Sequence, residues 1–512
     1  MRRSIVYIVC LILTSTIVYS QSPPIINAEN GSIKVERMDI LNSSFRETNI
    51  SITPNAQFLF FMSGRGGNEW STPDYTTFNG VSEYDGDIFM SEKANGKWTA
   101  PKAIGTNINT RSGEDEPVIS QDGQKVYFQS WMANWKSIGG PYYYSKLDGK
   151  HWRSKSAMGG GINQMFVDSS SKISATDGMT VSPDQRTFIV AAGKDYDGNL
   201  DLFISQKKDG KWSYLKKHPT STDQDERSVF LAADGKSLYF ASSGYGGKGG
   251  LDIFKAKLHS DGSIDEIVNL GEPFNTSQDD YGFIVAGNGY EAYFVRDGDI
   301  YHADLTDADD RIKPSRTVIL NGNIQDANGR PVKANVQIET ADGTLITSGT
   351  TNKISGNFSV SILPTMKDYK VRISTENYFK SFDLIIPKGE NEINKEYVIE
   401  LSQKPEHIIL FEFDNHYITP IEKKKLNAFI AKMKLHPEST IYLSGHTCSD
   451  GNHEYNVELS ENRAKRIYNH MIELGIPKHQ IQVSFHGSKQ PAETNSHASG
   501  RESNRRVEIT VK

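Results

Sequence analysis

The sequence predicts a multidomain chain that is mostly β structure and ends in one α/β domain. Three observations lead to this fold class. A unit of short aromatic strands and turns recurs five times before residue 310, strand-like runs follow, and strand and helix patterns alternate after residue 405. The chain has 512 residues, enough for about three domains. We therefore expect a β-propeller, a small β-sandwich and an α/β domain with a mixed sheet.

The first twenty residues have the pattern of a secretory signal peptide. Two arginines precede an apolar run that ends at the small residue Ser20. A lipid anchor on Cys10 is the alternative, but Cys10 lies inside the apolar run rather than after it. No other stretch reaches the roughly 18 apolar residues of a membrane helix. We expect residues 1–20 to be removed, the mature chain to be exported, and Cys448 to be its single thiol.

The repeats of residues 21–310 predict a β-propeller. Each unit has an Asp-Gly-type turn, an aromatic strand, a Gly-rich turn and a strand of the Asp-Ile-Phe type. The last of these strands begin at Asp87, Tyr142, Asp201, Asp252 and Asp299, which gives spacings of 55, 59, 51 and 47 residues. Such a period is typical of one propeller blade per repeat. Five blades are favoured, and six are the alternative.

The fifth repeat lacks an outer strand of its own. The segment Ile33 to Leu41, followed by Asn42-Ser43, is similar to the stretch from Ala103 to Asn109-Thr110 that precedes a later unit. We expect the N-terminal segment to complete the last blade, which closes the ring and hides the sheet edges. Together the units resemble the WD-like repeats of TolB-type propellers.

Acidic residues of the repeats are expected to cap turns and strands, because they recur at equivalent places. One stretch differs: Asp195, Asp197, Asn199 and Asp201 alternate around a Gly turn, as oxygen ligands of Ca²⁺ do. It lacks a distal bidentate Glu, so calcium is kept as the alternative to no cofactor. No nucleophile and base are recognisable together, and we predict that the protein is not an enzyme.

The middle of the chain, residues 317–402, predicts a small β-sandwich. Six strand-like runs are separated by turns such as Asp342-Gly343. The pattern of Gly322, Gly329-Arg-Pro-Val, Gly356-Asn-Phe and Tyr369 resembles the carboxypeptidase-regulatory (transthyretin-like) fold. This resemblance implies a spacer or an interaction surface.

After residue 405 the pattern changes to strand, helix, strand, helix, strand, strand. This order predicts a mixed sheet with helices on one face. The expected strands are 408–413, 440–444, 480–485 and 506–511, and the expected helices are 421–435 and 456–474.

The most informative stretch is Gly445 to Ala464, where a strand leads through a polar loop into a helix. A loop that enters a helix presents free backbone N–H groups and the positive end of the helix dipole, which suits anions. Arg463 lies in that helix, and its guanidinium is suited to bind a carboxylate with two hydrogen bonds. The residues therefore predict a small site for an acidic ligand.

Residues 405–512 are similar to the OmpA-like peptidoglycan-binding domain. The resemblance rests on Gly445-His-Thr, Gly451, Asn456, Leu459-Ser460, Arg463-Ala464, Gly475-Ile-Pro, Gly487, Pro491 and Asn504-Arg-Arg-Val, in order and spacing. It implies that the ligand is the diamino acid of the stem peptide, usually diaminopimelate. It further implies that Arg463 holds a ligand carboxylate with Arg505 nearby, and that Asn456 and the backbone around Thr447 complete the pocket.

Cys448 departs from that pattern, because the resemblance implies an Asp that meets the ammonium of the ligand. A neutral thiol cannot replace a charge-assisted contact worth about 1.5–3 kcal/mol. Asp450 takes over this role if the loop turns it inward. Alternatively Cys448 is a small filler, and binding is weaker or altered.

Two rival roles exist for the same loop. His446, Cys448, Asp450 and His453 alternate at a spacing that zinc ligands can have. Cys448 is also available for an intermolecular disulfide. Neither is preferred over the ligand pocket.

The order of parts resembles cell-envelope proteins of Bacteroidetes-type bacteria, including the PorE-type component of type IX secretion. We expect a non-catalytic periplasmic anchor that binds peptidoglycan and recruits a protein partner through its propeller, with outer-membrane association through partners. The alternatives are a hydrolase-associated propeller that binds glycan or peptide, and an assembly scaffold whose C-terminal site is degenerate. No basic patch suggests nucleic acid, and the net charge at pH 7 is −6.

Overall fold

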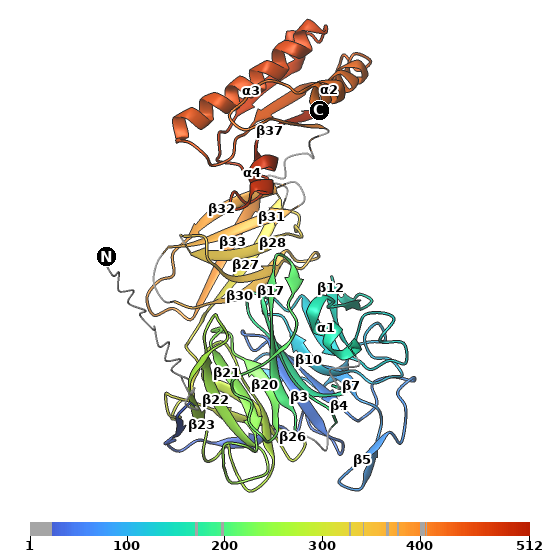
Figure 1. Ribbon diagram of the computed structural model, residues 1–512, viewed down its shortest axis with the longest axis vertical. Coiled ribbons are helices and arrows are strands. Elements are labelled where there is room, and N and C mark those ends of the chain that lie inside the picture. Colours follow the sequence, from blue (N-terminus) through green and yellow to red (C-terminus); the bar gives the residue numbers. More distant parts are fainter. Residues whose placement is uncertain are drawn as a thin grey trace, which may run out of the picture.

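Three parts follow one another along the long axis of the computed structural model: a ring of sheets, a middle β module and a C-terminal α/β domain (Figure 1). The structure describes residues 23–511 except 169–172, 196–198, 327–328, 341, 365–367, 376–377, 400–404 and 406. The predicted signal peptide and Cys10 lie outside these residues. Within them, no helix is both long enough and apolar enough to span a bilayer.

The ring consists of five antiparallel sheets whose first strands contact one another in a closed cycle. These first strands are β3 (Glu47–Ile52), β10 (Asp115–Ile119), β15 (Ala175–Val181), β20 (Glu226–Leu231) and β24 (Asp280–Val285), and β24 contacts β3 again. The second strands are β4 (Phe58–Ser63), β11 (Lys125–Gln129), β16 (Thr187–Gly193), β21 (Ser237–Ser242) and β25 (Glu291–Arg296). The third strands are β7 (Asp87–Ala94), β12 (Tyr142–Asp148), β17 (Asp201–Lys208), β22 (Asp252–Leu258) and β26 (Asp299–Asp304).

Shorter elements cover the outside of the ring. The outer strands are β8 (Lys97–Trp98), β9 (Lys102–Ala103), β13 (His151–Trp152), β14 (Ser156–Ala157), β18 (Lys211–Trp212), β19 (Lys216–Lys217) and β23 (Ile264–Asn269). A hairpin of β5 (Thr76–Phe78) and β6 (Val81–Glu83) and the helix α1 (Gly160–Val167) interrupt the repeat pattern. They were not predicted, because they lie in single units and have no counterpart in the others.

Every first strand carries a β-bulge, and each bulge holds one residue in the left-handed conformation. The five residues are Asn49, Glu116, Gly178, Ser228 and Gly282, with φ between 48° and 97°. A bulge bends and twists a strand, so five bulges at equivalent places curve the inner wall of the ring. These residues line an axial cavity of about 20 Å³. A cavity of this size has room for about one water molecule.

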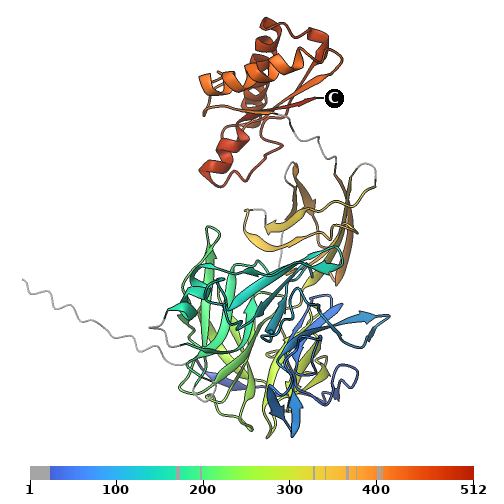
Figure 2. The same ribbon diagram turned by 90° about the vertical axis from the view of Figure 1, so that its right-hand side faces the viewer.

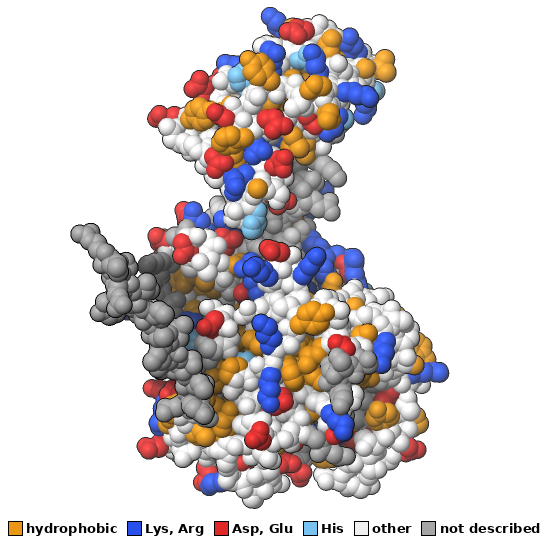
Figure 3. Space-filling model, in the orientation of Figure 1, with side chains coloured by type: hydrophobic (Ala, Val, Ile, Leu, Met, Phe, Trp, Pro, Cys, Tyr) orange, Lys and Arg blue, Asp and Glu red, His pale blue; other side chains and the backbone are white. Residues whose placement is uncertain are grey.

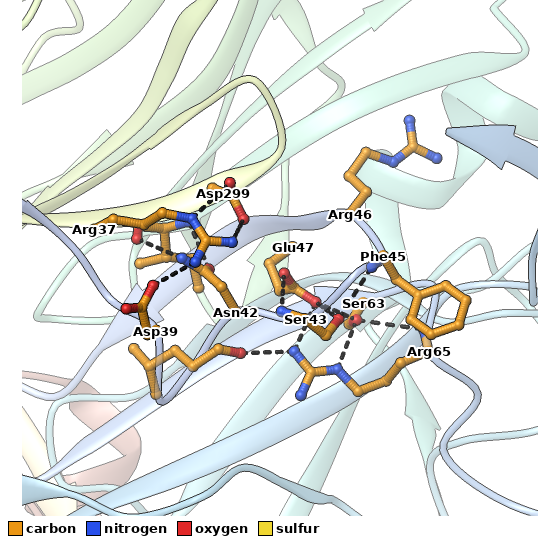
Figure 4. A network of polar contacts seen from close by, with 12 residues as sticks. Arg37, Asp39, Asn42, Ser43, Phe45, Arg46, Glu47, Ser63, Arg65 and Asp299 are labelled. Carbon is orange, nitrogen blue, oxygen red and sulfur yellow. Dashed lines mark hydrogen bonds and ion pairs between the residues drawn. The ribbon is translucent and has the colours of Figure 1, made fainter. Parts of the chain in front are cut away.

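The N-terminal segment closes the ring, as the sequence predicted. β2 (Val35–Arg37) pairs antiparallel with β26 in the fifth sheet. Arg37 donates to both carboxylate oxygens of Asp299, at 2.9 and 2.7 Å, and Asn42 exchanges two hydrogen bonds with the backbone of Ile300 (Figure 4). The segment also contributes β1 (Ile25–Asn27), which pairs in parallel with β23 and was not predicted.

Buried acids of the repeats hold turns, which confirms the role predicted for them. Asp252 accepts from the backbone N–H groups of Lys248 and Gly249, at 2.9 and 3.2 Å. A second set of acids lies at the start of four first strands or directly before it. Each accepts from the Ser or Thr four residues earlier: Glu47 from Ser43, Glu114 from Thr110, Glu226 from Thr222 and Asp280 from Thr276.

The middle module has seven strands rather than the six predicted. One sheet has the order β30-β27-β33 and the other β29-β28-β31-β32. The strands are β27 (Val318–Asp326), β28 (Asn335–Thr340), β29 (Leu345–Thr350), β30 (Asn357–Ile362), β31 (Tyr369–Thr375), β32 (Tyr378–Leu384) and β33 (Glu392–Ile399). The missed strand, β33, has mostly polar residues in its first half and apolar ones at its end, and lies parallel to β27, from Ile319 opposite Glu392 to Asp326 opposite Ile399.

The middle module stands on one face of the ring, where the turns between first and second strands lie (Figure 2). Asp122 in one of these turns accepts from the backbone N–H of Thr350 at 2.6 Å. Asn352 donates to the carbonyl of Gly149 at 2.9 Å, and Lys353 forms an ion pair with Asp148 at 2.5 Å. The ring and the middle module are therefore joined by hydrogen bonds and an ion pair as well as by the chain.

The C-terminal domain has the predicted mixed sheet, with strand order β34-β37-β35-β36. β35 is parallel to β36, and β37 is antiparallel to both β34 and β35. The elements are β34 (His407–Leu410), α2 (Pro420–Met433), β35 (Ile441–Gly445), α3 (His453–Glu473), a 3-10 turn (Lys478–Gln480), β36 (Ile481–Phe485), α4 (Ala498–Asn504) and β37 (Arg506–Val511). β34 is shorter than predicted, and α4 was missed. Acidic and basic side chains are interspersed over this domain on the face shown in Figure 3.

Candidate functional site

A pocket of about 190 Å³ lies where two loops of the C-terminal domain meet the first half of α3. One loop follows β34 and the other follows β35. The pocket brings together all six residues that the sequence analysis named: Thr447, Cys448, Asp450, Asn456, Arg463 and Arg505. Their role in holding a ligand stays a prediction, but their placement in one pocket is a property of the fold.

The loop after β35 is shaped by its contacts with α3. A Cβ added to Gly445 would lie 2.2 Å from the carbonyl oxygen of Ser460, so the strand can approach the helix this closely only with glycine. Gly451 takes a φ of 94°, which turns the chain into the helix. Asn452 caps α3 by accepting from the N–H of Tyr455 at 2.8 Å. The loop is therefore fixed at both ends.

Arg463 is fully buried and lacks a carboxylate partner within 4 Å among the described residues. Its guanidinium donates to the carbonyls of Asn415, His446 and Glu412, at 2.9, 3.0 and 3.2 Å. A guanidinium has five N–H groups, so two of them take no part in these three bonds. Burial lowers the pKa of Arg463 to about 10. The side chain therefore stays charged at neutral pH.

Arg505 adds a second positive charge to the same pocket. Its Nε donates to the carbonyl of Phe411 at 3.2 Å, and it forms no ion pair within the described part of the chain. Arg463 and Arg505 line the same pocket, and the charge of Arg505 is among the causes that lower the pKa of Arg463. Two cations without a carboxylate of their own favour an anionic group in the pocket.

Two carboxylates also line the pocket. Asp450 accepts from the thiol of Cys448 at 3.4 Å and lies 3.7 Å from Arg501, with its side chain 45% exposed. Asp414 accepts from the hydroxyl of Tyr455, and this bond raises the pKa of Tyr455. The pocket thus offers cations and carboxylates together, which suits a ligand that carries both a carboxylate and an ammonium.

The remaining predicted residues are buried and partly unsatisfied. Cys448 is 4% exposed, and its thiol points toward Asp450 rather than toward another sulfur. Asn456 donates to the carbonyl of Gly451 at 3.3 Å. The hydroxyl of Thr447 is buried and has no hydrogen-bond partner among the described residues, so it is available to a ligand.

No three of the four residues in the zinc alternative converge in the described part of the structure. His446, Cys448, Asp450 and His453 are all described, and no three His, Cys, Asp or Glu side chains converge anywhere in the described residues as metal ligands would. His446 instead stacks on His486, with ring centroids 5.1 Å apart.

The calcium candidates of the ring make separate contacts. Asp201 pairs with Lys217 at 2.9 Å, Asp195 lies 3.8 Å from Lys194, and Asn199 donates to a backbone carbonyl. Asp197 lies outside the described residues.

Sequence reasoning missed the wall of the pocket that follows β34, namely Phe413 and Asp414, and also Tyr455. A signal was present. β34 and β35 are both antiparallel to β37, so they run in the same direction and their carboxyl ends meet at one edge of the sheet. An acidic residue directly after the first strand therefore lies near the loop after the second.

Residues 410–505 match the OmpA family. The C-terminal domain is therefore OmpA-like, whereas the β-rich region before it is not assigned to a family. The chain is 32% identical over 102 residues to "Peptidoglycan-associated lipoprotein" of Legionella pneumophila, covering 20% of this chain and 58% of that protein. It is 32% identical over 103 residues to "Peptidoglycan-binding protein ArfA" of Mycobacterium tuberculosis, covering 20% of this chain and 32% of that protein.

Among solved structures, the C-terminal domain of Helicobacter pylori MotB is 25% identical, with a TM-score of 0.20, and the match covers 21% of this chain and 84% of that one. The chain spans between a third and three fifths of the length of the curated relatives named here.

Proposed function

We propose that the C-terminal domain binds peptidoglycan non-covalently through the diamino acid of its stem peptide, with diaminopimelate as the expected form. The observation that supports this most is the charge of Arg463, which lines the pocket, is buried and lacks a carboxylate partner among the described residues. The OmpA family match and the names of the relatives point to the same polymer.

The ligand would lie between the two sets of charges. Arg463 and Arg505 donate hydrogen bonds to its carboxylate, and Asp450 and Asp414 accept hydrogen bonds from its ammonium. Each charge-assisted hydrogen bond contributes about 1.5–3 kcal/mol. The thiol of Cys448 donates a hydrogen bond to Asp450. In this proposal the two residues together take the role that the resemblance gives to a single Asp.

The rest of the chain would make this domain an anchor in the cell envelope. In this proposal the five sheets form a five-bladed β-propeller that recruits a protein partner, and the middle module is a spacer. The protein is then non-catalytic and periplasmic, associated with the outer membrane through partners, in type IX secretion or a related assembly. The small axial cavity does not favour the rival in which a deep central channel takes a glycan or peptide.

The test is co-sedimentation of the full chain with purified peptidoglycan. Arg463→Ala should abolish the bound fraction, and Arg466→Ala should leave it unchanged. Arg466 is a matched control because it lies one turn further along α3, is exposed, and stacks on Tyr417 outside the pocket.

Free diaminopimelate should release the bound protein. Binding of the full chain that equals that of Arg463→Ala would overturn the proposal and favour a scaffold with a degenerate site. Thermal melting of both variants checks that a loss of binding does not reflect unfolding.

A further inference from the structure

A second and larger groove, of about 1320 Å³, lies between the ring and the middle module. One wall is the outward face of the sheet β30-β27-β33, and the other is formed by turns and strands of the first two sheets of the ring. Ligand sites are often found where two modules meet, and this volume exceeds the roughly 300–1,000 Å³ of a site for one small molecule. The groove therefore suits an oligomer.

The wall from the middle module is a ladder of asparagines. Asn323 of β27 is opposite Asn357 of β30, and Asn321 of β27 is opposite Asn394 of β33. Asn323 donates to the side-chain oxygen of Asn357 at 2.6 Å, and Asn321 to that of Asn394 at 3.4 Å. The side-chain nitrogens of Asn357 and Asn394 have no acceptor within the described residues. The ladder therefore presents free donors beside oxygens that retain lone pairs.

The opposite wall, which belongs to the ring, also presents side-chain amides. Gln57 and Gln124 add two further amides from turns of the ring, and Phe58 is among the apolar side chains of this wall. The charged side chains of the groove nearly balance: Glu92, Asp122, Glu392 and Glu396 against Lys93, Lys150 and Lys395. A groove with many amides, little net charge and an apolar strip is selective for a polar but uncharged ligand.

A neighbouring groove on the other side of the middle module provides a contrast. Its charged residues are four cations, Arg186, Lys207, Lys236 and Lys257, against two acids, Asp184 and Asp234, and Gln206 is its one amide. An anionic polymer would prefer that groove, because cations rather than amides neutralise its charge. The ladder is also presented by a sheet face rather than a sheet edge, so it offers side-chain amides and not the backbone ladder that an extended peptide needs.

We propose that the asparagine-lined groove binds a neutral oligosaccharide. A sugar hydroxyl both donates and accepts a hydrogen bond, as a side-chain amide does, and neighbouring hydroxyls match the paired donor and acceptor of one amide. The less polar face of a sugar ring can rest on Phe58. This site is separate from the pocket of the C-terminal domain, and its ligand does not depend on the function proposed for that pocket.

The test is calorimetric titration of the full chain with two neutral probes, a hexamer of N-acetylglucosamine and a β-1,4-linked glucose hexamer. At least one should bind saturably at roughly millimolar concentration or below. The double variant Asn357→Ala with Asn394→Ala should weaken that binding by about tenfold or more, as expected when central contacts are truncated. The probe that binds tells whether the ligand is N-acetylated, as the glycan of peptidoglycan is, or is a plain glucan.

Two controls separate this site from structural effects and from the other pocket. Asn335→Ala removes an exposed asparagine from the other sheet of the same module, at β28, and should change affinity by less than about twofold. Arg463→Ala should leave oligosaccharide binding equally unchanged. The proposal is overturned if neither hexamer binds, if a neutral octapeptide binds instead, or if the double variant binds as tightly as the unchanged chain.

Discussion

Two buried arginines of the ring pair with carboxylates, whereas Arg463 of the C-terminal domain is buried without one; its domain neighbour Arg506 pairs with Glu508 at 2.7 Å, as the arginines of the ring do. In the ring, Arg296 is 13% exposed and pairs at 2.5 Å with Asp280, which is fully buried. Arg65 pairs at 2.6 Å with Glu47, also fully buried, within the polar network of Figure 4. In the C-terminal domain, Arg463 is more buried than either. Its hydrogen bonds go to backbone carbonyls only, with no carboxylate within 4 Å among the described residues, and its guanidinium lies over the ring of Phe411.

The difference separates arginines that hold the fold from one that is kept for a ligand. A buried pair satisfies both charges inside the protein, and removing one partner leaves the other uncompensated. An arginine bound only to carbonyls keeps its charge unneutralised and part of its N–H groups unused. The following predictions sharpen or break this distinction, from the largest expected effect to the smallest.

Replacing Arg296 by Met should lower the free energy of unfolding of the ring by about 3–5 kcal/mol, because Asp280 is left buried without its cation. Denaturant unfolding measures this loss. Arg311→Met is the control, since Arg311 pairs with Asp309 but its side chain is 40% exposed, and its loss should cost about 1 kcal/mol or less. Equal effects of the two changes would contradict the importance of burial.

Replacing Arg463 by Met should weaken peptidoglycan binding by about 1.5–3 kcal/mol, or roughly ten- to 150-fold. Its effect on stability should be smaller than that of Arg296→Met. Three carbonyls lose a donor, but the cost of burying an unpaired charge disappears as well. Thermal melting compares the two variants, and equal destabilisation would make Arg463 a structural arginine like those of the ring.

Replacing Cys448 by Asp should tighten binding by about 1.5 kcal/mol, roughly tenfold, because a second carboxylate then faces the ammonium of the ligand. Cys448→Ser is the matched control and should change affinity little. Sedimentation at a series of peptidoglycan concentrations measures both. If Cys448→Asp binds where the unchanged chain does not, the natural pocket is degenerate.

Buried histidines should make the ring and the C-terminal domain lose stability in the same way when the pH falls. Burial lowers the pKa of His218 in the ring to about 4, and burial beside Arg506 and His486 lowers that of His446 well below 6.5. The unfolded chain gains these protons near pH 6.5 and the folded chain does not, so stability falls as pH drops from 6.5 toward 4. One unit below 6.5 the loss should be about 1 kcal/mol per histidine.

Calorimetry at about pH 7 and pH 5.5 should show the melting transitions of both regions move to lower temperature. His218→Gln should reduce the shift for the ring and leave that of the C-terminal domain as it is. A C-terminal transition that moves upward on acidification would contradict the neutral state of His446.

The repeat period and the closure of the ring could be predicted because identical roles produce similar residues. Asn42 and Asn109 each exchange two hydrogen bonds with the backbone of a third strand, Asn42 with β26 and Asn109 with β7. Their resemblance in sequence therefore reflects one structural role. Arg505, Asn456 and Thr447 could be named because a resemblance supplied them, and Arg463 also because a helical position and a loop entry suit an anion. Cys448 was named because it departs from that resemblance, and Asp450 because it is a carboxylate two residues further on.

The features that were missed depend on contacts between distant segments. Asp414 lies in a loop without periodicity, and its place in the pocket follows only from the strand order of the sheet. β33 was missed because it joins the sheet next to β27, about 75 residues earlier, and its burial pattern is that of an edge strand with one face exposed. Pairing of this kind leaves no signal in a short window of sequence.

The parallel pairing of β27 with β33 has a mechanical consequence. The ring is attached to the start of β27, and the C-terminal domain is attached to the end of β33. A pull between the two ends therefore drags these neighbouring strands past each other along their length. All the rungs from Ile319 to Asp326 resist at once, instead of opening one after another as a zipper does. The middle module is thus loaded in shear when the ring and the C-terminal domain are pulled apart.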